Sequence, residues 1–196
     1  TTSGSAGGLI GYNNSGAISS VTSSGDVVSS GDSTGGLIGS NSNSTISNGV
    51  STGNVTATGK NYVGGLVGMN SSSWISGTTS ASGNIIGGSY TGGLVGYNYS
   101  STITGATASG TVKGASYVGG LVGQNLTSST ISSSSSSGNV TGTSGRVGGL
   151  VGDNSSTITS SYSTGNVLGK DDSNVYQSYV GGLVGYNSNS NISGSY

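Results

Sequence analysis

The stretch that decides the fold is Gly92-Gly93-Leu94-Val95-Gly96, one of seven copies of this motif in the 196-residue chain. The fourth residue is Val or Ile, and successive copies start 28, 29, 28, 27, 29 and 33 residues apart. The copies begin at Gly7, Gly35, Gly64, Gly92, Gly119, Gly148 and Gly181. Self-similarity at this period indicates that one supersecondary unit recurs along the chain.

Two more apolar positions follow each motif at a nearly constant spacing. After Leu94, Ile103 stands 9 residues on, Val112 a further 9, and the next motif's Leu121 another 9. Each of these residues lies among β-branched and small residues bounded by Gly, Asn or Ser, a pattern typical of strands separated by turns. No segment has an apolar stripe of helical period. The longer last interval predicts an extra loop at 170–177.

The pattern predicts an all-β fold, a three-sided parallel β-solenoid of about seven coils of roughly 29 residues each. Equivalent strands would stack in parallel about 4.8 Å apart, so that Leu lies on Leu, Ile on Ile and Val on Val. A propeller blade needs about 40 residues, which the interval does not supply. The general preference of parallel crossovers favours a right-handed coil.

Residues 1–196 are expected to form a single, uncapped solenoid domain. Solenoids need terminal caps, because the end coils expose unpaired strand edges. Neither end of the sequence reads as a cap. We therefore expect a segment of a longer chain, or alternatively a subunit that stacks end to end in a fibre.

The composition excludes several classes of function. The chain has no Cys and no His, which are common nucleophiles, bases and metal ligands. Five acidic residues are too few for one calcium site per repeat, and four basic residues are too few to follow a nucleic-acid backbone. No apolar run approaches the roughly 18 residues of a membrane span. We expect no enzyme activity, no cofactor, no metal and no nucleic-acid partner.

An asparagine follows every motif two residues later, and stacked asparagine amides can hydrogen-bond along the coil direction. We therefore predict an asparagine ladder at one corner. The column comprises Asn13, Asn41, Asn70, Asn98, Asn125, Asn154 and Asn187. Tyrosines also recur beside the motif and predict stacked rings, with carbohydrate stacking as the alternative role.

The motif contains adjacent apolar residues, which would point to opposite faces of one strand. If Leu faces inward, the following column lies outside and forms an apolar stripe that needs a partner. The reverse choice would place Leu outside. The candidate assembly surface includes Val67, Val95, Val122, Val151 and Val184.

Hydroxyl residues flank the recurrent Ile. With Ile inward, Thr102 and Thr104 would face outward, as would Thr157 and Thr159 two repeats later. Thr-x-Thr columns of this kind are displayed by ice-binding solenoids, although Thr is also simply a good strand former. Trp74, Ala17 and Asn191 interrupt the array.

Taken together, the Gly-Gly-Leu-Val-Gly-x-Asn motif, the later Ile and the Gly-x-Val tripeptide resemble the GLUG repeat from Gly7 to Ile192. That family is found in large extracellular microbial surface proteins, including filamentous adhesins and the non-catalytic parts of surface peptidases. The resemblance implies a secreted, surface-displayed repeat region and assigns no catalytic residues.

We therefore expect a non-enzymatic structural segment of an extracellular or cell-surface fibre or adhesin, which supplies reach, stiffness and a repetitive surface. Its expected partners are further copies or neighbouring parts of the same chain, and a host-cell, surface or glycan ligand. The alternatives are an ice-binding solenoid and an accessory repeat region of a secreted enzyme.

Overall fold

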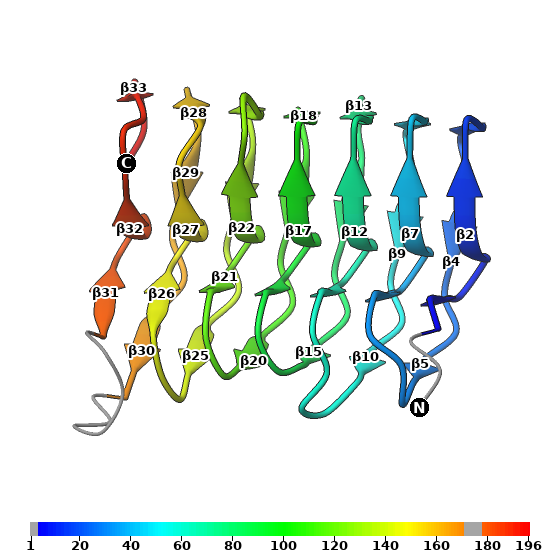
Figure 1. Cartoon of the computed structure of the whole chain (residues 1–196), viewed down its shortest axis with the longest axis horizontal. Coiled ribbons are helices and arrows are strands. Elements are labelled where there is room, and N and C mark those ends of the chain that lie inside the picture. The colour runs from blue at the N-terminus through cyan, green and yellow to red at the C-terminus, as the bar shows by residue number, and fades with distance from the viewer. Residues whose placement is uncertain (1–3, 171–177) are drawn as a thin grey trace.

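The computed structural model describes residues 4–170 and 178–196, and every element in these ranges is a β-strand. Each repeat coils onto the previous one, and the coils build five parallel sheets (Figure 1). We name the sheets A to E in the order in which a coil visits them. Sheets A, B and C have seven strands and sheets D and E have six, so the predicted parallel solenoid is confirmed. The extra loop predicted at 170–177 lies outside the described residues apart from Lys170.

The two sheets formed by the glycine motif are A and B. Sheet A contains β1 (Ala6–Gly7), β6 (Thr34–Gly35), β11 (Val63–Gly64), β16 (Thr91–Gly92), β21 (Val118–Gly119), β26 (Arg146–Gly148) and β31 (Tyr179–Gly181). Sheet B contains β2 (Ile10–Asn14), β7 (Ile38–Ser42), β12 (Val67–Ser71), β17 (Val95–Tyr99), β22 (Val122–Leu126), β27 (Val151–Asn154) and β32 (Val184–Asn187).

The other three sheets complete each coil. Sheet C contains β3 (Ala17–Ser19), β8 (Thr45–Ser47), β13 (Trp74–Ser76), β18 (Thr102–Thr104), β23 (Thr130–Ser132), β28 (Thr157–Thr159) and β33 (Ile192–Ser193). Sheet D contains β4 (Thr22–Ser23), β9 (Val50–Ser51), β14 (Ser80–Ala81), β19 (Thr107–Ala108), β24 (Ser135–Ser136) and β29 (Tyr162–Ser163). Sheet E contains β5 (Val27–Val28), β10 (Val55–Thr56), β15 (Ile85–Ile86), β20 (Val112–Gly114), β25 (Val140–Gly142) and β30 (Val167–Gly169).

The register places equivalent residues on one another, as predicted. Val95 pairs with Val122 in sheet B, and Ile75 pairs with Ile103 in sheet C. Because all pairings are in register, each apolar position becomes a continuous column along the solenoid.

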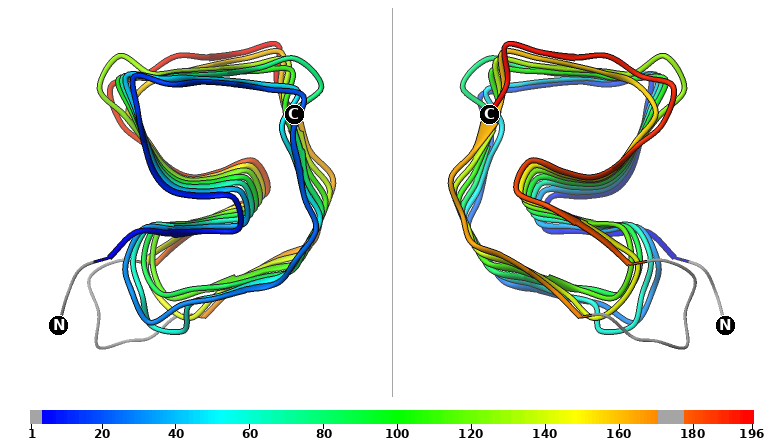
Figure 2. Two further views of the ribbon diagram at one scale, coloured as in Figure 1. Left: turned by 90° about the vertical axis from the view of Figure 1, so that its right-hand side faces the viewer. Right: turned by 90° about the vertical axis from the view of Figure 1, so that its left-hand side faces the viewer.

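The coil has five sheets instead of the three predicted sides. The glycine motif accounts for most of the difference, because it bends at its second Gly and its Leu and separates sheet A from sheet B. The chain folds inward at this bend, so that the outline of a coil is deeply indented on one side (Figure 2). The stretch between the Ile and Val columns adds the short sheet D, which the spacing of large apolar residues does not reveal.

Glycine is required where the inward fold brings two backbones together. A Cβ at Gly96, the last residue of the motif, would lie 2.6 Å from the backbone nitrogen of Val63 in the preceding coil. Sheets A and B therefore meet through their backbones, with no room for a side chain.

The tip of the inward fold needs glycine for a second reason. A Cβ at Gly93 would overlap the carbonyl oxygen of Gly120 and would lie 3.1 Å from the Cβ of Ala108 in sheet D. The same position is small in all six strands of sheet D: Ser23, Ser51, Ala81, Ala108, Ser136 and Ser163. The contact between the tip and sheet D divides the interior into two chambers.

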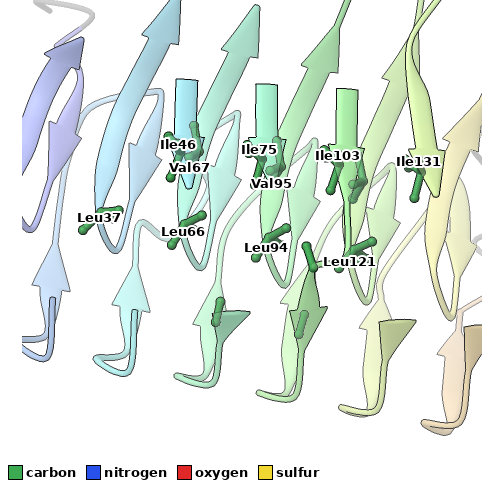
Figure 3. Packing of buried hydrophobic residues seen from close by; sticks show 14 of the residues in the cluster. Leu37, Ile46, Leu66, Val67, Ile75, Leu94, Val95, Ile103, Leu121 and Ile131 are labelled. Carbon is green, nitrogen blue, oxygen red and sulfur yellow. The ribbon is translucent and has the colours of Figure 1, made fainter. Parts of the chain in front are cut away.

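The larger chamber holds both apolar residues of the motif. Leu94 and Val95 are each 0% exposed and pack in one cluster with Ile103 of sheet C (Figure 3). The smaller chamber is built from the residue before the motif and the inner column of sheet E, such as Val118 and Val112. Full burial of one such side chain contributes roughly 1.5–3 kcal/mol.

Polar ladders tie the coils together inside the fold. The Nδ2 of Asn98 donates to the Oδ1 of Asn125 at 2.9 Å, and the whole asparagine column repeats this bond, which confirms the predicted ladder. A buried serine column beside it accepts backbone hydrogen bonds, as from the nitrogen of Ser73 to the Oγ of Ser101. The amides and hydroxyls of these two columns are thereby satisfied, which avoids a cost of about 1–3 kcal/mol for each group.

Replacing Gly93 with Ala tests the inward fold. We expect Gly93→Ala to lower the free energy of unfolding by roughly 1–3 kcal/mol, because the new methyl group overpacks the tip. Gly25→Ala is the matched control, since a Cβ there meets nothing within 4 Å. Urea unfolding followed by far-ultraviolet circular dichroism compares the two variants, and equal stability would contradict the proposed close contact.

Candidate binding surfaces

The predicted apolar assembly surface is wrong for four of its five valines. Val67, Val95, Val122 and Val151 are 0% exposed, and Val184 is partly buried against the same core. The prediction assumed that neighbouring Leu and Val share one straight strand. The bend after the second Gly breaks that alternation, so both residues enter the larger chamber.

The predicted hydroxyl columns do lie on the outer face of sheet C. Thr102, Thr104, Thr157 and Thr159 are partly exposed, while the intervening Ile103 and Ile158 are buried. Thr102 and Thr157 stand in one column on either side of Thr130. The opposite column is Thr104, Ser132 and Thr159, so three consecutive coils present a regular two-column array.

Stacked tyrosines lie where sheets A and B approach each other at the outer opening of the inward fold, which we call its mouth. The rings of Tyr62, Tyr90 and Tyr117, each just before a strand of sheet A, stack with centroids 5.0 Å and 4.8 Å apart. Tyr97 of sheet B meets Tyr62 edge-on at 5.3 Å, so the two walls of the mouth touch. The predicted stacking is confirmed, and each such pair contributes roughly 0.5–1.5 kcal/mol.

These three tyrosines have a left-handed backbone, with φ of +55°, +57° and +54°. Bulky residues rarely adopt this region, and the conformation costs roughly 1–2 kcal/mol per residue. Ser33, at the equivalent place before β6, has the same conformation with φ of +55°, so the left-handed turn belongs to the coil and does not depend on the ring stack. The sequence gives no signal for this backbone conformation.

An arginine continues the stack in the next coil. The Arg146 guanidinium lies 3.9 Å from the ring centroid of Tyr186 and 5.4 Å from that of Tyr117. Its Nη1 is 2.7 Å from Asp153 Oδ2, which also accepts a 2.7 Å hydrogen bond from the Nε2 of Gln124. The planar guanidinium takes the place of a ring, and the Asp153 carboxylate balances its charge.

Burial in this mouth changes the acidity of two phenols. Burial raises the pKa of Tyr90, and the neighbouring tyrosines, chiefly Tyr117, and Asp153 raise it further. Burial likewise raises the pKa of Tyr97, with Tyr62 and Tyr99 adding to the effect. The neutral phenol is therefore the form that the folded structure favours.

An exposed ladder that the sequence analysis missed runs along the turn before sheet E. The Oδ1 of Asp26 accepts a 2.8 Å hydrogen bond from the backbone nitrogen of Asn54, whose own Oδ1 accepts one from Asn84. Asn139 does the same for Asn166. The middle residue of Gly-x-Val is Asp, Asn or Thr in every repeat, and that preference was the available signal.

A polar hollow lies at the corner before sheet C in the last three coils. Its walls come from residues 128–130, 155–157 and 189–191, all of which are Ser, Thr or Asn. The hollow contains no titratable group, so its walls offer hydrogen bonds only.

Within residues 4–170 and 178–196, no three His, Cys, Asp or Glu side chains lie close enough together to hold a metal ion. No helix in these ranges is long and apolar enough to span a membrane.

The raised pKa values predict a loss of stability in alkali. An unfolded tyrosine ionises near pH 10, before Tyr90 or Tyr97 ionises in the fold, so this part of the stability is intact below about pH 10 and falls as the pH rises further. We expect Tyr90→Phe/Tyr97→Phe to lose less unfolding free energy between pH 8 and pH 11 than the parent chain. Thermal unfolding at both pH values measures this, with the exposed Tyr12→Phe as control. A parallel loss in the parent chain and the double variant would contradict the assignment.

Comparison with known proteins agrees with this repeat structure. The family model described as the GLUG motif matches residues 87–113, 114–141 and 176–196. The searches of curated proteins and of solved structures returned no match. GLUG motif repeats are therefore present in this β-solenoid, in agreement with the resemblance noted from its sequence.

Proposed function

We propose that this solenoid is a non-enzymatic structural segment of an extracellular or cell-surface fibre or adhesin. The observation that carries the proposal is the unbroken register of all five sheets along the described coils. Each coil is bonded to the next by backbone, amide and hydroxyl ladders, so the solenoid resists bending and stretching as a unit. Such a body provides reach and stiffness.

The surface chemistry supports a display role. Charged residues make up 5% of the chain, and the outer faces are rich in hydroxyl and amide groups. A rod with so little charge experiences little repulsion when similar rods lie beside it. The GLUG motifs that the family model matches add support, because the resemblance to this repeat implies a surface-displayed region.

Immunogold electron microscopy of intact producing cells tests this role. We expect label on the outside of unpermeabilised cells and its loss after brief external protease treatment. Gly93→Ala should reduce the surface label, since it weakens the inward fold, whereas Gly25→Ala should not. Label confined to permeabilised cells would overturn the proposal.

The hydroxyl columns of sheet C favour ice binding as a second candidate function. The in-register residues 102–104, 130–132 and 157–159 form a regular array of Thr and Ser hydroxyls on three consecutive coils. This array is the longest run of consecutive coils on sheet C's described face without an interruption by Ala, Trp or Asn.

Ice-crystal shaping and thermal hysteresis test the second candidate. We expect an ice-binding array to lose most of its activity in Thr130→Lys, which places a flexible charge at the array's centre. Thr141→Lys on the outer face of sheet E is the matched control. Absence of faceting and hysteresis in the parent chain would dismiss ice binding.

A further inference from the structure

Trp74 is the largest side chain on the outer face of sheet C and the one tryptophan in the sequence. Its side chain is 58% exposed, although tryptophan is highly buried on average. No aromatic ring or cation lies against the indole among the described residues. Every other coil has Ala, Thr or Asn at this position.

The indole lies between two hydroxyl residues. Thr45 and Thr102 pair with Trp74 in the neighbouring coils, each about 4.8 Å away along the solenoid. Ser76 and Thr104 stand in the second column of the same face. None of these hydroxyl groups is hydrogen-bonded to another side chain or to the backbone within the described part of the chain, so all can bond to a ligand.

The face around Trp74 carries no charge. The described strands of sheet C contain no Asp, Lys or Arg from Ala17 to Ser193. A charged polymer would therefore find no counter-charge here. A neutral ligand that offers both an apolar face and hydroxyl groups matches the surface better.

The stacked tyrosines are less suited to this role. The faces of Tyr90 are covered by Tyr62 and Tyr117 in the stack, which leaves mainly ring edges for a ligand. Tyr162 is stacked on Tyr196 in the same way. Trp74 instead presents an uncovered ring.

We propose that Trp74 is the stacking platform of a binding site for a neutral glycan, a chain of pyranose sugars. The C–H face of a sugar ring packs on the indole, and its equatorial hydroxyls bond to the Thr45 and Thr102 side chains. The biological use of this site rests on the proposed surface role, whereas the binding itself does not depend on it.

Intrinsic fluorescence of the purified chain tests the site directly, because the signal excited at the red edge comes from Trp74 alone. The probes are soluble hexamers of β-1,4-linked glucose, mannose and N-acetylglucosamine, with hexagalacturonate as the charged comparison. We expect at least one neutral hexamer to shift the emission to shorter wavelength in a saturable way. The charged hexamer should leave it unchanged.

Calorimetry with the hexamer that binds compares all variants on one scale, since those at position 74 lack the fluorophore. Trp74→Thr continues the threonine column of the neighbouring coils and should weaken binding at least tenfold, with unchanged circular dichroism. Trp74→Phe should retain part of the affinity, and Thr45→Ala should lower it severalfold. Thr157→Ala, three coils away in the same column, is the matched control.

Four outcomes would overturn the proposal: no response to any neutral hexamer, stronger binding of the charged hexamer, equal affinity in Trp74→Thr, or a fluorescence shift that follows protein concentration without sugar. The last outcome would identify a second copy of the chain as the occupant. Surface label on cells is read independently, so failure of the glycan site and failure of the surface role are distinguishable.

Discussion

The structure depends on the backbone contact between sheets A and B. Two strands can fold back against each other at this distance only if glycine lines the contact, as Gly96 does opposite Val63. The contact turns the chain inward and places Leu94 and Val95 in the same chamber. Without it, one of these two columns would face water along the whole solenoid.

The fold class was predictable because the sequence repeats itself. The spacing of Leu, Ile and Val defines the parallel register, and the regular asparagine position predicts the ladder, which lies within the strands of sheet B. The inward fold was not predictable from that spacing, because the alternation rule holds only within a straight strand and the bend falls between Gly93 and Val95. Sheet D was not predicted, because its inner residues are small and add no large apolar position to the repeat. The reason for their small size is the contact between Gly93 and Ala108, which only the structure shows.

The candidate surfaces were predictable to a smaller extent. The outward Thr columns followed directly from an inward Ile, since a three-residue strand alternates simply. The predicted valine surface failed for the reason just given. The mouth of the inward fold, with Arg146 between two tyrosine rings, joins residues of two sheets that a linear pattern cannot bring together.

The asparagine column has a consequence for the evolution of such chains. Each Asn offers a donor toward one neighbouring coil and an acceptor toward the other, so the two broad sides of every coil are complementary to each other. Recombination that removes or duplicates one whole repeat joins the same complementary sides again. Rod length can therefore drift by whole units over generations while the cross-section stays constant.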